Sequence, residues 1–388
     1  MNNLYLATLR KNIEEGRHVV RVMGLSGPAQ SYFLARFLSG LHRPCFVVLP
    51  SSKDSERLYK ELYFFMSQGK STGAFSKTRL HSFPAYDITP LTGLSPHREI
   101  VTKRLQALYC LISNPNPVII TSLEALAHRI VPKEAFVRSL EYMEAGESVD
   151  RDHFLRKIEA AGFQRVALVE EEGDYAVRGG VIDLYPPLHP LPIRLEFWGD
   201  RVESIRYFHP LSQRSQRTLK EVVILPASEI IRDEPNMKRA RSMGRLPEAA
   251  EGGTSFPGQE AWLNHFYDRP DALFDYLPPG AARGLDVPPQ TLLQRRLLQQ
   301  LPPGAQNGTG QFRIRPRSEA AERLHQPGEV VPLRKAAIGD EHEFLGPGFR
   351  VAHRVNKMMS SLDDEGQSQR NNAVHEILHQ ARDGEDIE

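Results

Sequence analysis

The first third of the chain alternates short apolar segments with longer amphipathic ones, and this order constrains the fold more than any other feature. The apolar segments predict strands and the amphipathic ones predict helices, because their apolar residues recur with the periods of those structures. Strands that alternate with helices form a parallel sheet with helices on both faces, so an α/β fold is predicted. The strands are expected at residues 18–23, 45–49, 79–83 and 118–121, and the helices at residues 31–41, 55–65 and 97–112.

The helix expected from His97 has a clear apolar face. Its apolar residues recur at nearly helical spacing, namely Ile100, Leu105, Leu108 and Ile112. Its charged residues are interpreted as a solvated surface, namely Arg98, Glu99, Lys103 and Arg104.

The turn after the first expected strand is similar to a phosphate-binding P-loop without its lysine. It reads Gly24-Leu25-Ser26-Gly27-Pro28-Ala29-Gln30-Ser31. In a P-loop, glycines let backbone N–H groups surround the phosphates, the lysine neutralises their charge and the last hydroxyl holds magnesium. Gly24 and Ser31 fit, and Gly27 adds a glycine to the loop, but Ala29 replaces the second glycine and Gln30 the lysine. The turn and its place before a helix indicate that the chain descends from a nucleotide-binding protein, whereas the missing lysine predicts that this chain does not turn over ATP. The alternative is a chance glycine-rich turn before a helix.

Composition is that of a soluble protein with two or three domains. Of 388 residues, 40% are hydrophobic and 25% charged, with a net charge of +1, so the chain is not a bulk polyanion binder. Cys45 and Cys110 are too few for a disulfide framework and lack metal-site spacing, which favours a reducing compartment. Because no apolar run is long enough to cross a bilayer and no leader pattern opens the chain, a cytoplasmic protein is expected.

Short β segments separated by Gly and Pro replace the alternating pattern between residues 165 and 226. They predict a separate, mostly antiparallel module. The segments are expected at residues 166–169, 175–185, 193–198 and 202–208.

The clearest element of this module is a hairpin around Gly199-Asp200-Arg201. With these three residues as the loop, Trp198 faces Val202, and the register pairs Ile193 with Tyr207 and Leu195 with Ile205. One face of the hairpin is apolar and consists of Ile193, Leu195, Phe197, Ile205 and Tyr207. The opposite face carries Arg194, Glu196, Trp198 and Arg206. Arginines beside a large aromatic predict an interaction hot spot; alternatively, Trp198 covers a neighbouring helix and the arginines are solvated.

The rest of the chain gives weaker signals. Aromatic and aliphatic residues between Phe256 and Pro278 predict a segment that returns to the first domain. Pro-Pro pairs and polar runs after Gly280 favour linker, and a poorly ordered tail is expected from residue 301. The predicted boundaries are therefore residues 1–135, 136–228, 229–300 and 301–388.

The tail contains an H-E-x-x-H motif, in which two histidines on one helical face bind zinc and the glutamate acts as general base. The motif consists of His375, Glu376 and His379, and nine residues follow His379. A zinc peptidase is one alternative, but neither a third ligand nor a substrate-binding domain is evident, so a chance pair of histidines on a polar helix is favoured.

Several of these segments together resemble one known family. The runs Gly173-Asp174-Tyr175-Ala176-Val177-Arg178-Gly179-Gly180-Val181-Ile182-Asp183-Leu184-Tyr185-Pro186, Pro192-Ile193-Arg194-Leu195-Glu196-Phe197-Trp198-Gly199-Asp200, Glu203-Ser204-Ile205-Arg206 and Ser212-Gln213-Arg214-Ser215 resemble the interaction domain shared by UvrB and the bacterial transcription-repair coupling factor. Gln30 and the short passage Phe83–Arg98 favour the coupling factor, because UvrB has an intact P-loop and a longer DNA-gripping hairpin. The resemblance covers about residues 1–300.

The resemblance implies a non-catalytic, UvrB-like domain 1a followed by a domain that binds UvrA, with no cofactor. By position, the family's UvrA-contacting residues correspond to Arg178, Arg194 and Trp198, with Arg206 beside them; the family often has phenylalanine where this chain has Trp198. The family's RNA polymerase-binding and motor domains are not visible, so polymerase binding is not expected and any DNA association is weak or indirect. A truncated copy or short paralogue with an open UvrA-binding face is expected. Residual nucleotide or DNA binding is the alternative.

Overall fold

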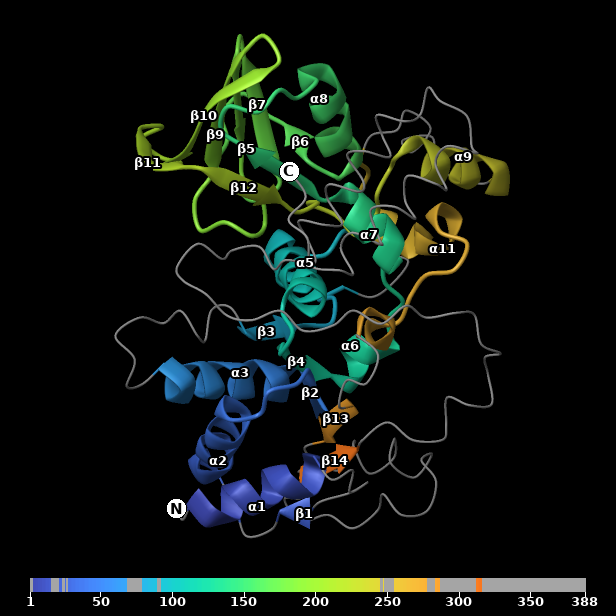
Figure 1. Ribbon diagram of the computed structural model, residues 1–388. Coiled ribbons are helices and arrows are strands. Elements are labelled where there is room, and N and C mark those ends of the chain that lie inside the picture. The colour runs from blue at the N-terminus through green and yellow to red at the C-terminus, as the bar shows by residue number, and fades with distance from the viewer. Residues whose placement is uncertain are drawn as a thin grey trace, which may run out of the picture. The chain divides into compact units, whose positions relative to one another are not determined.

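The computed structural model describes residues 3–14, 21–22, 25, 27–67, 79–88, 92–244, 247, 255–277, 283–286 and 312–315, and the structural statements below concern these residues. They form two six-stranded sheets, a two-stranded sheet and the helices around them (Figure 1). The helices are α1 (Asn3–Glu14), α2 (Pro28–Ser39), α3 (Ser52–Ser67), α5 (Arg98–Ser113), α6 (Leu123–Ala127), α7 (Lys133–Ser139), α8 (Arg151–Ala160), α9 (Glu234–Met243) and α11 (Leu263–Phe266), with the 3₁₀ helices η1 (Gln259–Trp262) and η2 (Leu273–Tyr276). The strands are β1 (Arg21–Val22), β2 (Cys45–Leu49), β3 (Leu80–Phe83), β4 (Val118–Ser122), β5 (Glu141–Glu144), β6 (Gln164–Arg165), β7 (Asp174–Arg178), β8 (Val181–Leu184), β9 (Ile193–Trp198), β10 (Arg201–Phe208), β11 (Ser215–Leu219), β12 (Glu221–Ile224), β13 (Arg283–Asp286) and β14 (Phe312–Arg315).

The first sheet has the strand order β1-β14-β13-β2-β4-β3. Strands β13, β2, β4 and β3 are parallel, whereas β14 runs antiparallel to both β13 and β1. The strands predicted at 45–49, 79–83 and 118–121 are confirmed to within one residue. Strands β13 and β14 lie in the stretch predicted as linker and tail, and they separate β1 from β2. A P-loop-like arrangement of this sheet therefore stays a prediction.

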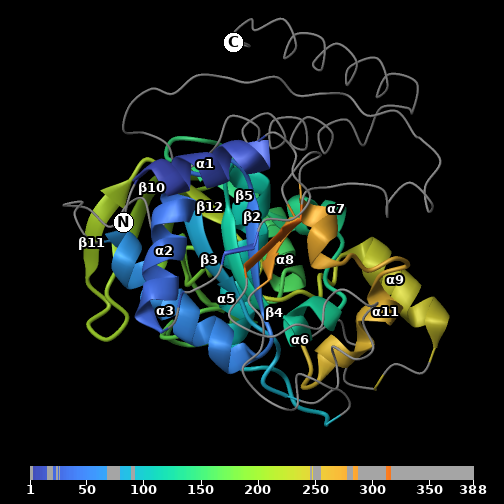
Figure 2. The ribbon, with the colours of Figure 1, turned by 90° about the horizontal axis from the view of Figure 1, so that it is seen from below.

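Helices cover both faces of the first sheet. On one face, α1, α2 and α3 pack against the buried side chains of β2, β3 and β4 (Figure 2). On the other, α5 contributes the fully buried Leu105 and Leu108, and Phe46 of β2 meets Phe274 of η2 with ring centroids 5.3 Å apart. Among the described residues, none of the helices combines the length and apolar character needed to cross a bilayer.

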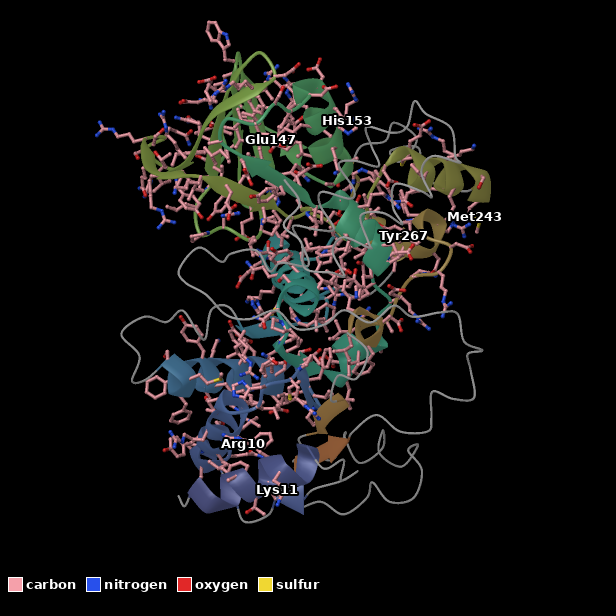
Figure 3. The ribbon with its side chains drawn as sticks, in the orientation of Figure 1. Arg10, Lys11, Glu147, His153, Met243 and Tyr267 are labelled. Carbon is pink, nitrogen blue, oxygen red and sulfur yellow. The ribbon has the colours of Figure 1, made fainter. Side chains whose placement is uncertain are left out.

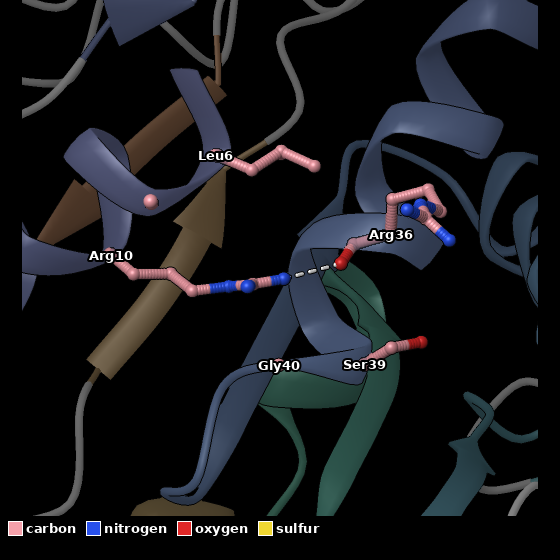
Figure 4. Close-up of a pocket in the computed structure, with 6 residues that line it drawn as sticks. Leu6, Arg10, Arg36, Ser39 and Gly40 are labelled. Atoms are coloured by element: carbon pink, nitrogen blue, oxygen red, sulfur yellow. Dashed lines mark hydrogen bonds between the residues drawn. The ribbon is translucent and has the colours of Figure 1, made fainter. Parts of the chain in front are cut away.

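Arg10 of α1 closes the C-terminal end of α2, where backbone carbonyls lack partners within the helix. Its Nη2 donates to the carbonyl oxygen of Arg36 at 2.6 Å (Figure 4) and to that of Phe37 at 3.2 Å. A Cβ at Gly40 would lie 2.2 Å from Cζ of Arg10, so a larger residue there would displace the guanidinium at the flexible end of that side chain. Arg10 thus lines the cavity of about 380 Å³ between the two helices, where its role is to cap α2.

The second sheet has the order β11-β10-β9-β8-β7-β6 and is antiparallel except between β6 and β7. Helix α8 packs on its inner face through Phe154 and Ile158. The strand predicted at 166–169 is wrong, because that segment crosses the face of the sheet opposite α8 and buries Val169 there against Ala176 and Phe208. The single segment predicted at 175–185 is two strands, since Gly179, at φ 58°, turns the chain between β7 and β8.

Arg104 of α5 is buried in the core, so its assignment to a solvated surface is wrong. Its guanidinium lies between the rings of Phe83 and Tyr86, 4.2 Å from each centroid. Its Nε and Nη2 donate to the buried carboxylate of Glu229 at 2.5 and 3.3 Å. Burial alone would lower the pKa of Arg104, but the Glu229 carboxylate and Tyr86 raise it above its ordinary value. This cation therefore ties α5 to the segment that follows β12 of the two-stranded sheet.

The same segment is held by Tyr267, which lies beside α11 (Figure 3). Its hydroxyl donates to the carbonyl oxygen of Glu229 at 2.9 Å and accepts from the backbone N–H of Ile231 at 2.7 Å. Arg98, at the start of α5, reaches Asp174 of β7 at 2.8 Å. These contacts join α11 to residues 229–231 and α5 to β7, and the return of residues 256–278 to the first domain stays a prediction.

His189 links β10 to β12 by hydrogen bonds at both ring nitrogens. Nε2 lies 2.8 Å from the carbonyl oxygen of Val223, and Nδ1 lies 2.8 Å from the hydroxyl of Tyr207. Because a carbonyl only accepts, Nε2 carries the proton and Nδ1 accepts from the tyrosine. Burial lowers the pKa of His189 to about 4, so the folded protein holds this ring neutral.

We expect acid to destabilise the protein through His189. An unfolded histidine has a pKa of about 6.5, so the unfolded chain binds more protons than the folded one as the pH falls from there toward the folded value of about 4. The free energy of unfolding should fall by up to about 3 kcal/mol across this window and stay constant with pH above it, as far as this group is concerned.

Urea unfolding of the full chain at pH 7 and pH 4.5 measures this loss. His189→Gln should show a smaller loss between the two pH values than the parent, whereas His153→Gln, an exposed histidine on α8 (Figure 3), should keep it. Equal losses in the parent and His189→Gln would contradict the assignment.

Candidate functional site

The turn between β9 and β10 presents Trp198 to solvent. Its side chain is 81% exposed, and Gly199 adopts φ 60° in the turn that follows. Tryptophan is costly to leave in water and is enriched where proteins bind one another. The alternative that Trp198 covers a neighbouring helix is therefore wrong for the described residues.

The register of this hairpin corrects the prediction near the turn and confirms it further along. Trp198 pairs with Arg201, not with Val202, because the loop has two residues. A bulge between Val202 and Ser204 takes up the difference. Beyond it the predicted pairs are present: Ile205 with Leu195, Tyr207 with Ile193 and Arg206 with Arg194.

Arg194 lies on the same face as Trp198, but its guanidinium is bound within the sheet. Nε and Nη2 donate to the two carboxylate oxygens of Asp183 at 2.7 and 2.9 Å, and the Asp183 side chain is 2% exposed. Cζ lies 4.8 Å from the ring centroid of Phe208. The hydrogen bonds to Asp183 raise the pKa of Arg194. The guanidinium of Arg194 thus joins β8 and β9, and its predicted contact with a partner stays a prediction.

Arg178 and Arg206 are the more accessible cations of this face. Arg178, at the end of β7, is exposed and donates through Nη2 to the carbonyl oxygen of Ala167 at 2.9 Å. Arg206 is 38% exposed and pairs with Glu196 at 3.2 Å. Since cross-strand partners share a face, the register puts both arginines on the side of the sheet that carries Trp198. We call this side, with Arg178, Arg194, Trp198 and Arg206, the outer face.

The P-loop-like turn is described only in part, because Gly24 and Ser26 lie outside the described residues. Gly27 has φ 52° and precedes α2, which begins with Pro28. Gln30 donates its backbone N–H to the Gly27 carbonyl oxygen at 3.1 Å. The buried Ser31 donates its hydroxyl to the carboxylate of Glu61 on α3. A carboxylate at this helix start repels phosphate, and the hydroxyl that would hold magnesium is already bound.

His375, Glu376 and His379 of the H-E-x-x-H motif also lie outside the described residues, so the motif stays untested. Within the described part of the chain, His, Cys, Asp and Glu side chains form no group of three or more arranged to hold a metal ion.

Sequence reasoning missed the loop His209–Arg214 between β10 and β11, which we call the β10–β11 loop. It carries Leu211, 83% exposed, and Gln213, whose φ is 56°. The run Ser212-Gln213-Arg214-Ser215 drew attention to the loop by resemblance, but no residue pattern predicts a glutamine with positive φ.

Comparison with known proteins identifies the second sheet. Residues 142–230 match the family model of the UvrB interaction domain. The transcription-repair-coupling factor of Myxococcus xanthus is 33% identical over 275 residues, which cover 66% of this chain and 23% of that protein. The one of Escherichia coli (strain K12) is 28% identical over 271 residues, with 66% and 23% covered.

UvrB itself is similar over much of the same chain. The UvrABC system protein B of Thermosipho africanus is 25% identical over 236 residues, covering 60% of this chain and 36% of that protein. The matched part thus spans about a quarter of the coupling factors and about a third of this UvrB. Residues 142–230, with Arg178, Arg194, Trp198 and Arg206 among them, match the UvrB interaction domain, within a chain that is similar to transcription-repair-coupling factors.

Proposed function

We propose that this chain is a non-catalytic, UvrB-like adaptor of nucleotide excision repair that acts in the cytoplasm and binds UvrA through the outer face. The observation that carries the proposal is Trp198, which is 81% exposed on that face of a UvrB interaction domain. A rigid aromatic anchor with arginines around it is the composition of a protein-binding hot spot.

The charges of the outer face support a partner with acidic groups. Arg178 projects from β7, and Arg206 remains partly exposed despite its pair with Glu196. Guanidinium groups bind carboxylates and carbonyl oxygens in fixed geometry. We therefore assign apolar contact to Trp198, direct polar contacts to Arg178 and Arg206, and a supporting role to Arg194, which Asp183 already binds.

The non-catalytic part of the proposal rests on the turn before α2. Gln30 cannot supply the charge of a P-loop lysine, and Ser31 is hydrogen-bonded to Glu61. Both features disfavour a bound triphosphate. A binding role thus requires the first sheet only as the support of the second.

Replacing Trp198 by alanine should weaken UvrA binding without unfolding the chain. Removing a central aromatic anchor costs about 2 kcal/mol, which corresponds to a rise in Kd of about 30-fold. The measurement is calorimetric titration of purified UvrA with the full chain.

The matched control is Phe64→Ala, which removes another exposed aromatic, 55% exposed on α3 of the first sheet. Its Kd should equal that of the parent. If Trp198→Ala also binds UvrA like the parent, the outer face is not the binding site.

A further inference from the structure

The β10–β11 loop is held in a strained conformation by hydrogen bonds to β9 and to the segment that crosses the outer face. Gln213 has φ 56°, in the region that costs non-glycine residues about 1 kcal/mol or more. Its backbone N–H donates to the His209 carbonyl oxygen at 2.7 Å, which closes the loop on itself. Strain of this kind persists only where the surroundings impose it.

Two side chains impose this conformation from the outer face. Arg194 Nη1 donates to the carbonyl oxygen of Gln213 at 3.3 Å, and the Gln213 amide donates to the carbonyl oxygens of Val169 and Pro210 at 3.3 and 2.5 Å. Within the described residues, Oε1 of Gln213 is buried and has no hydrogen-bond partner. The loop is thus fastened to β9 and to the segment that crosses the outer face.

This conformation places an apolar side chain in water. Leu211 is 83% exposed at the loop, close in value to the 81% of Trp198. Single exposed leucines are common and need no explanation. Here, however, the exposed leucine lies on a strained loop that is hydrogen-bonded by Arg194. Arg194 belongs to β9, the strand that ends at Trp198. Arg194 and Trp198 are four residues apart on one face, about 13 Å along the strand.

We propose that the β10–β11 loop is a second docking element for UvrA, with Leu211 as its apolar contact and Arg194 and Gln213 as positioning residues. The inference rests on the proposed function of the outer face. The exposed Arg214 next to Gln213 adds a cation, so the expected surface on UvrA is apolar with acidic groups around it. Arg194 then serves binding by holding the loop, because its own guanidinium is bound to Asp183.

Calorimetric titration of purified UvrA with full-length variants tests the contact. Leu211→Asp should raise Kd at least about tenfold, because a carboxylate replaces the apolar contact and faces acidic groups. Leu94→Asp is the matched control, since Leu94 is also strongly exposed, at 61%, but precedes α5. Its Kd should not change.

Gln213→Gly tests positioning separately from folding. Glycine tolerates positive φ, so the variant should keep the thermal midpoint of the parent while it releases the loop. Its Kd should rise, and adding Leu211→Asp should then raise Kd less than in the parent, because the two changes disable one element. A purely structural role would leave Kd of Gln213→Gly unchanged.

The outcomes separate the two proposals. Parent-like affinity of Leu211→Asp together with loss in Trp198→Ala overturns the loop proposal and leaves the proposed function in place. Absence of UvrA binding by the parent chain overturns both.

Discussion

Replacing Arg104 by methionine is expected to lower the free energy of unfolding by about 3–5 kcal/mol, the cost of breaking a buried ion pair. Arg104 and Glu229 are 0% and 1% exposed, so the variant leaves a carboxylate in the core that, among the described residues, keeps the Tyr86 hydroxyl as its side-chain donor. The guanidinium also fills the space between Phe83 and Tyr86, which methionine occupies without its charge.

Urea unfolding of the full chain at pH 7 measures this loss. Lys103→Met is the matched control, because it removes the neighbouring cation of α5, which is 41% exposed and pairs with Glu99 at the surface. It should change the free energy of unfolding by no more than about 0.5 kcal/mol. Similar losses in the free energy of unfolding for both variants would contradict the claim that burial of the Arg104–Glu229 pair makes Arg104→Met destabilising.

Arg194→Ala should cost about 3 kcal/mol of stability, in addition to any effect on binding. The variant leaves Asp183, 2% exposed, without its bidentate partner and removes the stacking on Phe208. A loss of UvrA affinity in this variant therefore does not by itself show a contact between Arg194 and UvrA.

Two further variants resolve this ambiguity. Adding Asp183→Asn to Arg194→Ala removes the stranded charge and should recover part of the lost stability, measured by urea unfolding. Arg206→Ala breaks a more exposed pair with Glu196 on the same face and should cost no more than about 1 kcal/mol. If Arg194→Ala is as stable as Arg206→Ala, the Asp183 pair contributes little to the fold.

The period-two pattern predicted the inner and outer faces of the β9–β10 hairpin, because alternation along a strand follows from its geometry. It could not predict the bulge near Val202, which depends on backbone conformation at the turn. The same pattern placed Arg194 on the outer face without revealing Asp183, since a register between β8 and β9 was needed to bring the two together.

Helical spacing alone would have predicted that Arg104 is buried, but its charge led to its assignment to a solvated surface. Arg104 lies one turn from both Ile100 and Leu108, so it falls on the apolar face of α5. A buried arginine requires a partner, and Glu229 is distant in sequence and invisible to a local pattern. Similarly, β13 and β14 have four residues each, too few for periodicity to distinguish them from linker.

The position of β13 has a consequence for how the protein is made. Leu285 of β13 pairs with Val47 of β2, so a central strand of the first sheet gains this neighbour only after residues 142–230, which match the UvrB interaction domain, have been synthesised. Contacts this remote in sequence slow folding, because a long loop must close before they form. Until then, the backbone N–H and C=O groups along one edge of the apolar β2 have no strand partner. Such an unpaired edge can associate with other chains. Synthesis of the chain through residue 286 is thus a condition for covering this edge of β2.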